Sequence, residues 1–216
     1  MNSILVIGAG KFGRHLAMYL CDMGNEVMLV DKNEKLIDEF SHRVTTAEIG
    51  DYTVRSNLEA LGVEDYDYVF VCTGDFQDSL VMVDYLKELN ARCIIAKANS
   101  RIHEKFLLKN GADRVIYPER DIAYKLSVAY SNNNIYDFIN LSDDVGIYEI
   151  KVPDSWIGKS LAKLNVRRMH NINVIGYRVD RDNKIKAVSN ADYIFCSNQH
   201  IMIMGDKNDV RKITKK

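Results

Sequence analysis

Short apolar runs alternate with amphipathic stretches through the first part of the chain. Runs typical of buried strands occupy residues 4–7, 26–30, 45–49, 68–72, 93–96 and 114–116. Between them, apolar residues recur at helical spacing from Phe12 onward and over residues 32–40, 76–89 and 101–110. Strands and helices that alternate in this way form βαβ units, and wholly apolar strands are covered on both faces. The pattern predicts a Rossmann-like, doubly wound parallel sheet of the α/β class.

The pattern changes after residue 116. A longer helical stretch begins at Glu119 and is interrupted by three consecutive asparagines at 132–134. Residues 146–152 and 172–179 then alternate or run apolar, and 180–184 fit a hairpin turn before a strand over 185–188. A helix over 161–169, a strand over 200–204 and a short helix from residue 206 complete the chain. We predict one domain over residues 1–140 and a small α+β domain over 141–216.

Charge and composition exclude several classes of protein. The 29 Lys and Arg residues nearly balance the 30 Asp and Glu residues, which gives no basic surface for a nucleic-acid backbone. No apolar run approaches the roughly 18 residues of a membrane-spanning helix. The first apolar run lacks a basic leader, and the 4 cysteines have neither zinc-site spacing nor a disulfide pattern. We expect a cytoplasmic protein without a nucleic-acid partner.

A glycine-rich turn between the first strand and the first helix is the strongest candidate site. Gly8 permits a tight turn, Gly10 lets a phosphate approach the backbone, and Gly13 lets helix and strand pack closely. The helix N-terminus favours an anion, with Lys11 and Arg14 beside it. These two cations are equally explained as surface residues of a first helical turn. The turn predicts a nucleotide phosphate.

Polar residues follow the next three strands of the predicted sheet. Asp31 ends the second strand, where its carboxylate can accept both ribose hydroxyls and would repel a 2′-phosphate. Asp51 could accept an adenine amine or cap the helix that follows Thr53. Thr73 and Gly74 suit a position near phosphates or a nicotinamide, or simply precede a capped helix. These residues favour an adenine nucleotide and do not separate NAD from ATP, ADP or AMP.

These segments resemble the RCK (regulator of potassium conductance) subunits of bacterial Ktr and Trk potassium-uptake systems. The resemblance covers essentially the whole chain, and its second half supplies most of the specificity, because the first half is shared with NAD-binding folds generally. It rests on residues 7–14, 30–33, 49–51, 69–73, 115–119, 158–161, 164, 166–167 and 173–175.

The resemblance implies a cytosolic regulatory subunit that docks on a membrane potassium channel or transporter. It implies a homodimer that assembles into an octameric ring, with ATP/ADP or NAD(H) bound in the first domain. The positions that match nucleotide contacts of the family are Gly8, Gly10, Lys11, Phe12, Gly13, Arg14, Asp31, Lys32, Asn33, Asp51, Tyr52, Thr73 and Gly74.

Two further sites follow from the resemblance alone. Glu119 matches an acidic residue that can hold a divalent cation or Na+ beside the nucleotide, although it could simply stabilise the first turn of its helix. Some relatives bind cyclic di-AMP between C-terminal domains, where Arg167, His170, Asn173 and Val174 would lie. A turn residue explains Asn173 equally well, and a solvated helix face explains Arg167.

A small NAD-dependent oxidoreductase is the alternative function. Such an enzyme needs a proton donor, yet the 12 tyrosines include no Tyr-x-x-x-Lys pair and the second domain offers no obvious acid–base pair. The sequence His103-Glu104 lacks the second histidine of a zinc protease, so we interpret His103 as a surface or packed residue. We expect a sensor of nucleotides and not an enzyme.

Overall fold

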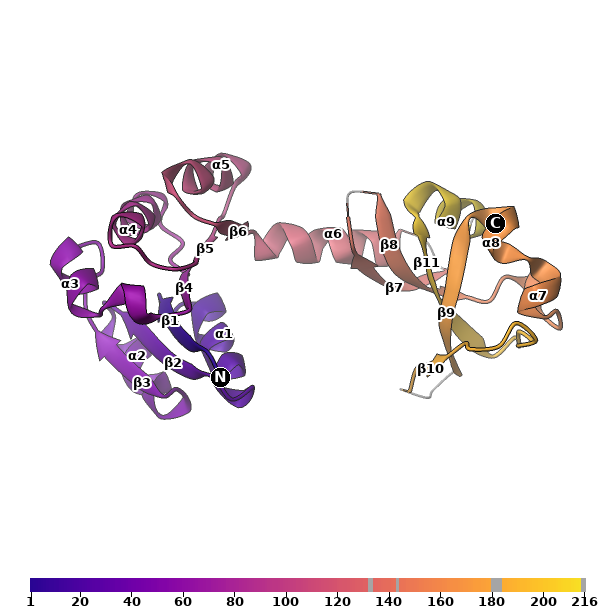
Figure 1. Cartoon of the computed structure of the whole chain (residues 1–216), viewed down its shortest axis with the longest axis horizontal. Helices are drawn as coiled ribbons and strands as arrows, with labels where there is room; N and C mark the ends of the chain where they lie inside the picture. The colour runs from indigo at the N-terminus through magenta and orange to yellow at the C-terminus, as the bar shows by residue number, and fades with distance from the viewer. Residues whose placement is uncertain (132–133, 143, 180–183, 215–216) are drawn as a thin grey trace. The chain divides into compact units, whose positions relative to one another are not determined.

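The computed structural model describes residues 1–131, 134–142, 144–179 and 184–214. These form two compact units, Met1–Glu119 and Arg120–Lys216 (Figure 1). The structure thus divides the chain earlier than the predicted boundary after residue 140. That boundary falls at the end of a strand, β7 (Ile135–Asn140), which pairs with β8 (Val145–Lys151) of the second unit.

The first unit contains the predicted Rossmann-like parallel sheet. Its strands lie in the order β3-β2-β1-β4-β5-β6, and every neighbouring pair is parallel. The order reverses between β1 and β4, and ligands of such folds bind at the carboxyl ends of the strands beside this point. The strands are β1 (Ser3–Ile7), β2 (Glu26–Asp31), β3 (Thr46–Ile49), β4 (Tyr68–Val71), β5 (Ile94–Lys97) and β6 (Arg114–Ile116).

Helices cover both faces of this sheet. Alternate residues of β1 point to opposite faces, so Ile4 packs in one apolar cluster with α1 and α2, and Leu5 packs in another with α3, α4 and α5. Both clusters are buried, which explains the nearly unbroken apolar runs in the sequence. The helices are α1 (Lys11–Asp22), α2 (Glu34–Phe40), α3 (Arg55–Ala60), α4 (Phe76–Glu88) and α5 (Arg101–Asn110).

The second unit is the predicted small α+β fold. Five strands form an antiparallel sheet in the order β10-β9-β11-β8-β7, where β9 is Ile172–Val179, β10 is Lys186–Ala187 and β11 is Gln199–Asp206. The apolar core lies on one face of the sheet and includes Trp156, Phe195 and Ile201. The helices of this unit are α7 (Leu161–Leu164), α8 (Val166–His170) and α9 (Lys207–Thr214), and α6 (Pro118–Tyr130) belongs to it from Arg120 onward.

Three local features differ from the sequence predictions or fall outside them. The helix predicted over 161–169 is two short helices, α7 and α8, because Asn165 between them has a left-handed backbone with φ 44°. Strand β7 was not predicted. Residues 180–183 of the predicted hairpin turn, and Asn132 and Asn133, lie outside the described residues. In the described part of the chain, no helix combines the length and apolar character that a membrane crossing requires.

Candidate functional site

The glycine-rich turn joins β1 to α1 at the point where the strand order reverses. Gly8 has φ +106°, a conformation that favours glycine, and its N–H donates to Val30 O at 2.7 Å. A Cβ atom on Gly13 would lie 1.9 Å from Gly8 O, whereas one on Gly10 would meet no atom within 4 Å. The packing of the chain itself therefore requires glycine at 8 and 13. Gly10 instead borders open space, which fits the close approach of a ligand to the backbone.

The N-terminus of α1 is suited to an anion. Its N-cap residue, Gly10, offers no side-chain acceptor for the first N–H groups, and the first turn contains no acidic residue. These N–H groups and the helix dipole favour a negative charge. The Arg14 guanidinium lies 4.8 Å from the centre of the Phe40 ring, and its buried Nε has no hydrogen-bond partner among the described residues. Arg14 thus holds its charge close to the anion-binding end of α1.

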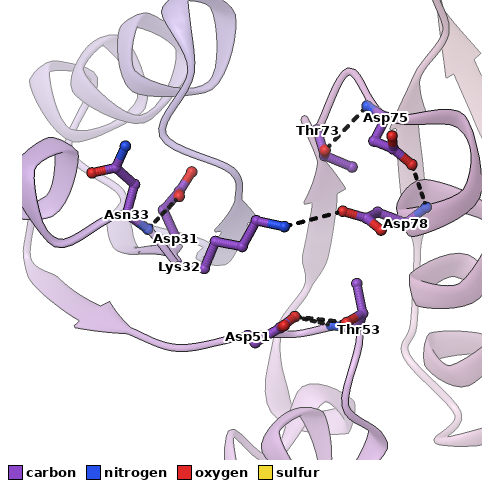
Figure 2. A network of polar contacts seen from close by, with 8 residues as sticks. All are labelled: Asp31, Lys32, Asn33, Asp51, Thr53, Thr73, Asp75 and Asp78. Carbon is purple, nitrogen blue, oxygen red and sulfur yellow. Dashed lines mark hydrogen bonds and ion pairs between the residues drawn. The ribbon is translucent and has the colours of Figure 1, made fainter.

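Asp31 is fixed at the carboxyl end of β2. Its Oδ2 accepts a hydrogen bond from Ala9 N at 2.6 Å. Its Oδ1 accepts one from Asn33 N at 2.8 Å (Figure 2). Asn33 caps α2, because its side chain accepts from Lys35 N at 3.1 Å. The carboxylate therefore links the glycine-rich turn to the start of α2. Each oxygen has a second acceptor position, which suits the two hydroxyls of a ribose.

Lys32 lies between three carboxylates at the edge of the site. Its Nζ is 3.4 Å from Asp78 Oδ2, and this hydrogen bond and charge, with smaller effects of Asp51 and Asp31, raise the pKa of Lys32. The pair joins the end of β2 to the first turn of α4 (Figure 2). Sequence analysis did not identify Asp78, because no motif marks it and its relevance depends on the folded position of α4.

Asp51 forms a local turn after β3. Its Oδ1 accepts from the Thr53 hydroxyl at 2.7 Å and from Thr53 N at 3.0 Å, and these bonds hold the pKa of Asp51 below its ordinary value (Figure 2). Asp51 does not cap α3, whose N-cap is Val54. The ring of Tyr52 beside it is buried, with 2% of its surface exposed, and its hydroxyl donates to Glu48 Oε1 at 3.3 Å. Burial raises the pKa of Tyr52, so its hydroxyl stays protonated.

The turn after β4 completes the site. Asp75 caps α4 by accepting from Asp78 N at 2.8 Å, while Thr73 Oγ1 accepts from Asp75 N at 3.3 Å. The capped helix predicted as the alternative for this segment is therefore present, and it does not exclude a ligand contact at Thr73. Thr73 reaches the pocket, and Gly74 does not line it.

These segments enclose one pocket at the carboxyl ends of β1, β2, β3 and β4. Six predicted residues line it, and Ile7, Gly50, Asp78 and Met82 lie beside them. The other seven predicted contact residues do not line the pocket and lie at the anion-binding end of α1 or in the flanking turns. The six are Gly8, Asp31, Lys32, Asp51, Tyr52 and Thr73. The seven outside it are Gly10, Lys11, Phe12, Gly13, Arg14, Asn33 and Gly74.

Glu119 lies in the first turn of α6, the helix that follows β6. Its carboxylate is 2.9 Å from Lys97 Nζ, and this hydrogen bond holds the pKa of Glu119 below its ordinary value. Within the described residues, no group of three or more His, Cys, Asp or Glu side chains is placed to hold a metal ion. Glu119 alone therefore offers a cation one carboxylate, which already carries a partner.

A second hollow lies beside α8 in the second unit. Arg167, Asn173 and Val174 line it, and Arg167 Nε donates to Asn173 Oδ1 at 2.7 Å. His170 does not line it, because its ring packs against Trp156 with centroids 5.7 Å apart. The structure thus brings three of the four predicted residues together.

Comparison with known proteins decides the family. The TrkA-N domain matches residues 4–118, and the TrkA-C domain matches residues 147–216. Ktr system potassium uptake protein C of Bacillus subtilis is 32% identical over 98% of this chain and 95% of its own length. Ktr system potassium uptake protein A of the same organism is 33% identical over 96% of this chain and 93% of its length. The chain belongs to the Ktr and Trk family of potassium-uptake proteins.

Solved structures share the fold of this chain. The RCK domain of the GsuK channel matches 100% of this chain and 48% of that chain, with a TM-score of 0.71 and 17% identity. The GsuK channel bound to NAD matches 100% of this chain and 40% of that chain, with a TM-score of 0.73 and 16% identity. At these identities the match establishes the fold. The predicted family and fold are confirmed.

Proposed function

We propose that this member of the Ktr and Trk family is a nucleotide-binding regulatory subunit that gates a potassium channel or transporter in the membrane. The observation that carries the proposal is the position of Asp31, fixed beside the glycine-rich turn at the strand-order reversal. That arrangement suits the ribose and phosphates of ATP/ADP or NAD(H). The family membership supports the potassium-transport partner.

In this proposal, each group of residues contacts one part of the nucleotide. Asp31 and Lys32 hold the ribose, and Asp51 and Tyr52 border the adenine. The glycine-rich turn and the N-terminus of α1 bind the phosphates, with Lys11, Phe12 and Arg14 beside them. Asn33 supports the ribose side of the site. Thr73 and Gly74 lie across the crevice from the glycine-rich turn. The open space at Gly10 supports this placement, because a ligand can reach the backbone there.

Regulation follows from differential binding. A ligand shifts a conformational equilibrium only as far as its affinities for the two states differ. We propose that ATP and ADP favour different angles between paired first domains in a homodimer. An octameric ring of such dimers would transmit the difference to the membrane partner at the cytoplasmic face. The mass of the purified protein in solution tests the ring, and a monomeric mass at all protein concentrations would contradict it.

Two further ligands belong to this proposal. A divalent cation or Na+ at Glu119 would compete with Lys97 for the carboxylate, and its remaining ligands would come from nucleotide phosphates or a second copy of the chain. Cyclic di-AMP would occupy the hollow at Arg167, Asn173 and Val174 between two second domains. The guanidinium and carboxamide there suit phosphate and base edges, respectively.

Binding and turnover separate this function from the oxidoreductase alternative. We expect calorimetric titration of the full chain to detect ATP, ADP or NAD(H), with no consumption of NADH when hydride acceptors are added. The potassium-uptake relatives of the Ktr and Trk family support the non-enzyme proposal. Preferential binding of NADH with steady turnover would instead support the reductase.

A further inference from the structure

A chain of hydrogen-bonding side chains runs from the core of the first unit to the turn after β4. Ser79 in α4 and His103 in α5 are both fully buried, and Ser79 Oγ lies 2.7 Å from His103 Nε2. On the other side of the ring, His103 Nδ1 lies 3.1 Å from Asn99 Oδ1. Asn99 Nδ2 donates to Gly74 O at 3.0 Å. Two helices and the loop after β5 thereby reach the backbone of the turn.

Each ring nitrogen of His103 has polar partners. Asn99 donates Nδ2–H to Gly74, so its Oδ1 faces the ring, and the backbone N–H of Asn99 lies 3.4 Å from His103 Nδ1. Ser79 Oγ lies 2.7 Å from Nε2 and 3.0 Å from Phe76 O. A neutral ring satisfies both contacts, and burial lowers the pKa of His103. The contacts form a continuous series from Ser79 through His103 and Asn99 to Gly74, and linked hydrogen bonds strengthen one another.

Thr73 and Asp75 also make hydrogen bonds within the turn, but the turn is open to solvent at Gly74. Gly74 is exposed, and a Cβ atom on it would meet no atom within 4 Å. The turn nevertheless borders the glycine-rich turn, because a Cβ atom on Gly8 would lie 3.0 Å from Thr73 N. The first phosphate of a nucleotide would lie at the N-terminus of α1. Because β4 neighbours β1, the groups of the nucleotide beyond that phosphate would lie beside the turn after β4. The position of Gly74 therefore affects the longer nucleotides most.

We propose that His103 is a positioning residue of the nucleotide site, which together with Ser79 and Asn99 holds the turn after β4 against the part of the ligand beyond its first phosphate. This inference rests on the proposed nucleotide-binding function for its ligand. The hydrogen bonds that hold the turn are present without a ligand, so their effect on the turn can be measured separately from nucleotide binding.

Hydrogen exchange in the nucleotide-free full chain tests the hold on the turn. His103→Ala would leave a cavity in the core, so Ser79→Ala and Asn99→Ala are the better variants. We expect the amides of residues 74–78 to exchange about fivefold faster in both, the effect of one lost hydrogen bond. Ser127→Ala and Asn110→Ala are matched controls. Ser127 donates to Tyr124 O without a histidine partner, and Asn110 links α5 to Leu80 O without touching the turn.

Calorimetric titration then tests the effect on ligands. We expect Ser79→Ala and Asn99→Ala to bind ADP and ATP about fivefold more weakly while AMP stays near the wild-type affinity. Asn99→Ala removes the hydrogen bond to Gly74, and Ser79→Ala removes the contact that holds the His103 ring against Asn99. Unchanged exchange at residues 74–78, or equal losses for AMP and ATP, would overturn the inference. If the wild-type chain bound no nucleotide, the proposed function would fail, and faster exchange would still establish the hold on the turn.

Discussion

Asp31 accepts hydrogen bonds from the backbone N–H groups of Ala9 and Asn33, so a single carboxylate fixes the turn after β1 and the turn after β2. The same oxygens face the pocket at the strand-order reversal. Because two backbone N–H groups already hold the Asp31 side chain, the binding of a ribose costs little further side-chain conformational entropy. At the scale of residues, Asp31 is thus the group on which the site depends most.

Removing this carboxylate tests its role. In Asp31→Ala, we expect the affinities for AMP, ADP and ATP to fall by a similar factor of about tenfold or more, because hydrogen bonds to a charged group are lost. Calorimetry measures the change. Asp38→Ala, an exposed acid in α2, is the control and should bind normally. Unchanged affinity in Asp31→Ala would remove this residue from the site.

The contribution of Arg14 to nucleotide affinity should depend on the length of the phosphate chain. Arg14 lies in the first turn of α1 with its guanidinium over the Phe40 ring, and we propose that it contacts the terminal phosphate of the longer nucleotides. In Arg14→Ala, we expect ATP to lose about tenfold in affinity and AMP to lose little, since a charge-assisted hydrogen bond to a terminal phosphate disappears. Arg43→Ala, which removes an exposed cation, is the control and should bind both nucleotides normally. Equal losses for ATP and AMP would give Arg14 a structural role.

Sequence analysis identified most of these residues but not their partners. The positions of Asp31 and Thr73 follow from strand ends and motif spacing, which are local features of the sequence. Asp78 and the buried pair of Ser79 and His103 depend on how α4 and α5 pack, and His103 lies 24 residues from its serine partner. A polar pair that is far apart in the sequence and satisfied only in the folded core leaves no periodic signal.

At the scale of elements, the join between β1 and α1 sets the geometry of the site. Gly13 allows the helix to approach the strand, and Gly10 exposes the backbone to a ligand. The two glycines therefore serve different purposes within one motif. The motif itself was recognisable because glycine is irreplaceable at such close approaches.

Alanine at each glycine should separate stability from binding. Gly13→Ala places its Cβ 1.9 Å from Gly8 O, so we expect a loss of about 2 kcal/mol in the free energy of unfolding. Gly10→Ala has space and an ordinary φ of −60°, so its stability should stay within about 0.5 kcal/mol while nucleotide affinity falls. Urea unfolding and calorimetry measure both. Normal binding by Gly10→Ala would contradict the phosphate position.

The turn after β3 should make stability depend on pH. Hydrogen bonds from Thr53 lower the pKa of Asp51 in the folded chain, so this carboxylate stabilises the fold above its unfolded pKa of about 3.9. The contribution is lost as pH falls through the lowered folded pKa. In Thr53→Val, we expect lower stability than wild type at pH 7 and a smaller difference below pH of about 3.9. Equal wild-type and variant stabilities at pH 7 would contradict this.

Two elements were not predictable from periodicity. The register of β7 shifts between Ile135 and Asp137, which breaks the alternation that marks a strand in sequence. The helix over 161–169 divides because Asn165 adopts a left-handed backbone that asparagine tolerates more readily than most residues. In both cases an irregular backbone interrupts a pattern that depends on regular spacing.

At the scale of the whole molecule, the chain pairs a nucleotide-type fold with a small antiparallel domain that has its own core. The family's TrkA-N and TrkA-C domains match these two regions in the same order. The parallel sheet followed from the alternating pattern, whereas the start of the second unit at Arg120 depends on contacts that sequence spacing does not reveal. Together the two units agree with the two-domain organisation of the family.

The most direct test of this account is potassium flux through the reconstituted membrane partner in vesicles, with the full chain added in the presence of ATP or ADP. We predict that flux differs between the two nucleotides with the wild-type chain and that Asp31→Ala abolishes the difference. Equal flux with ATP and with ADP in the wild-type complex would contradict the claim that this chain regulates transport by binding nucleotides.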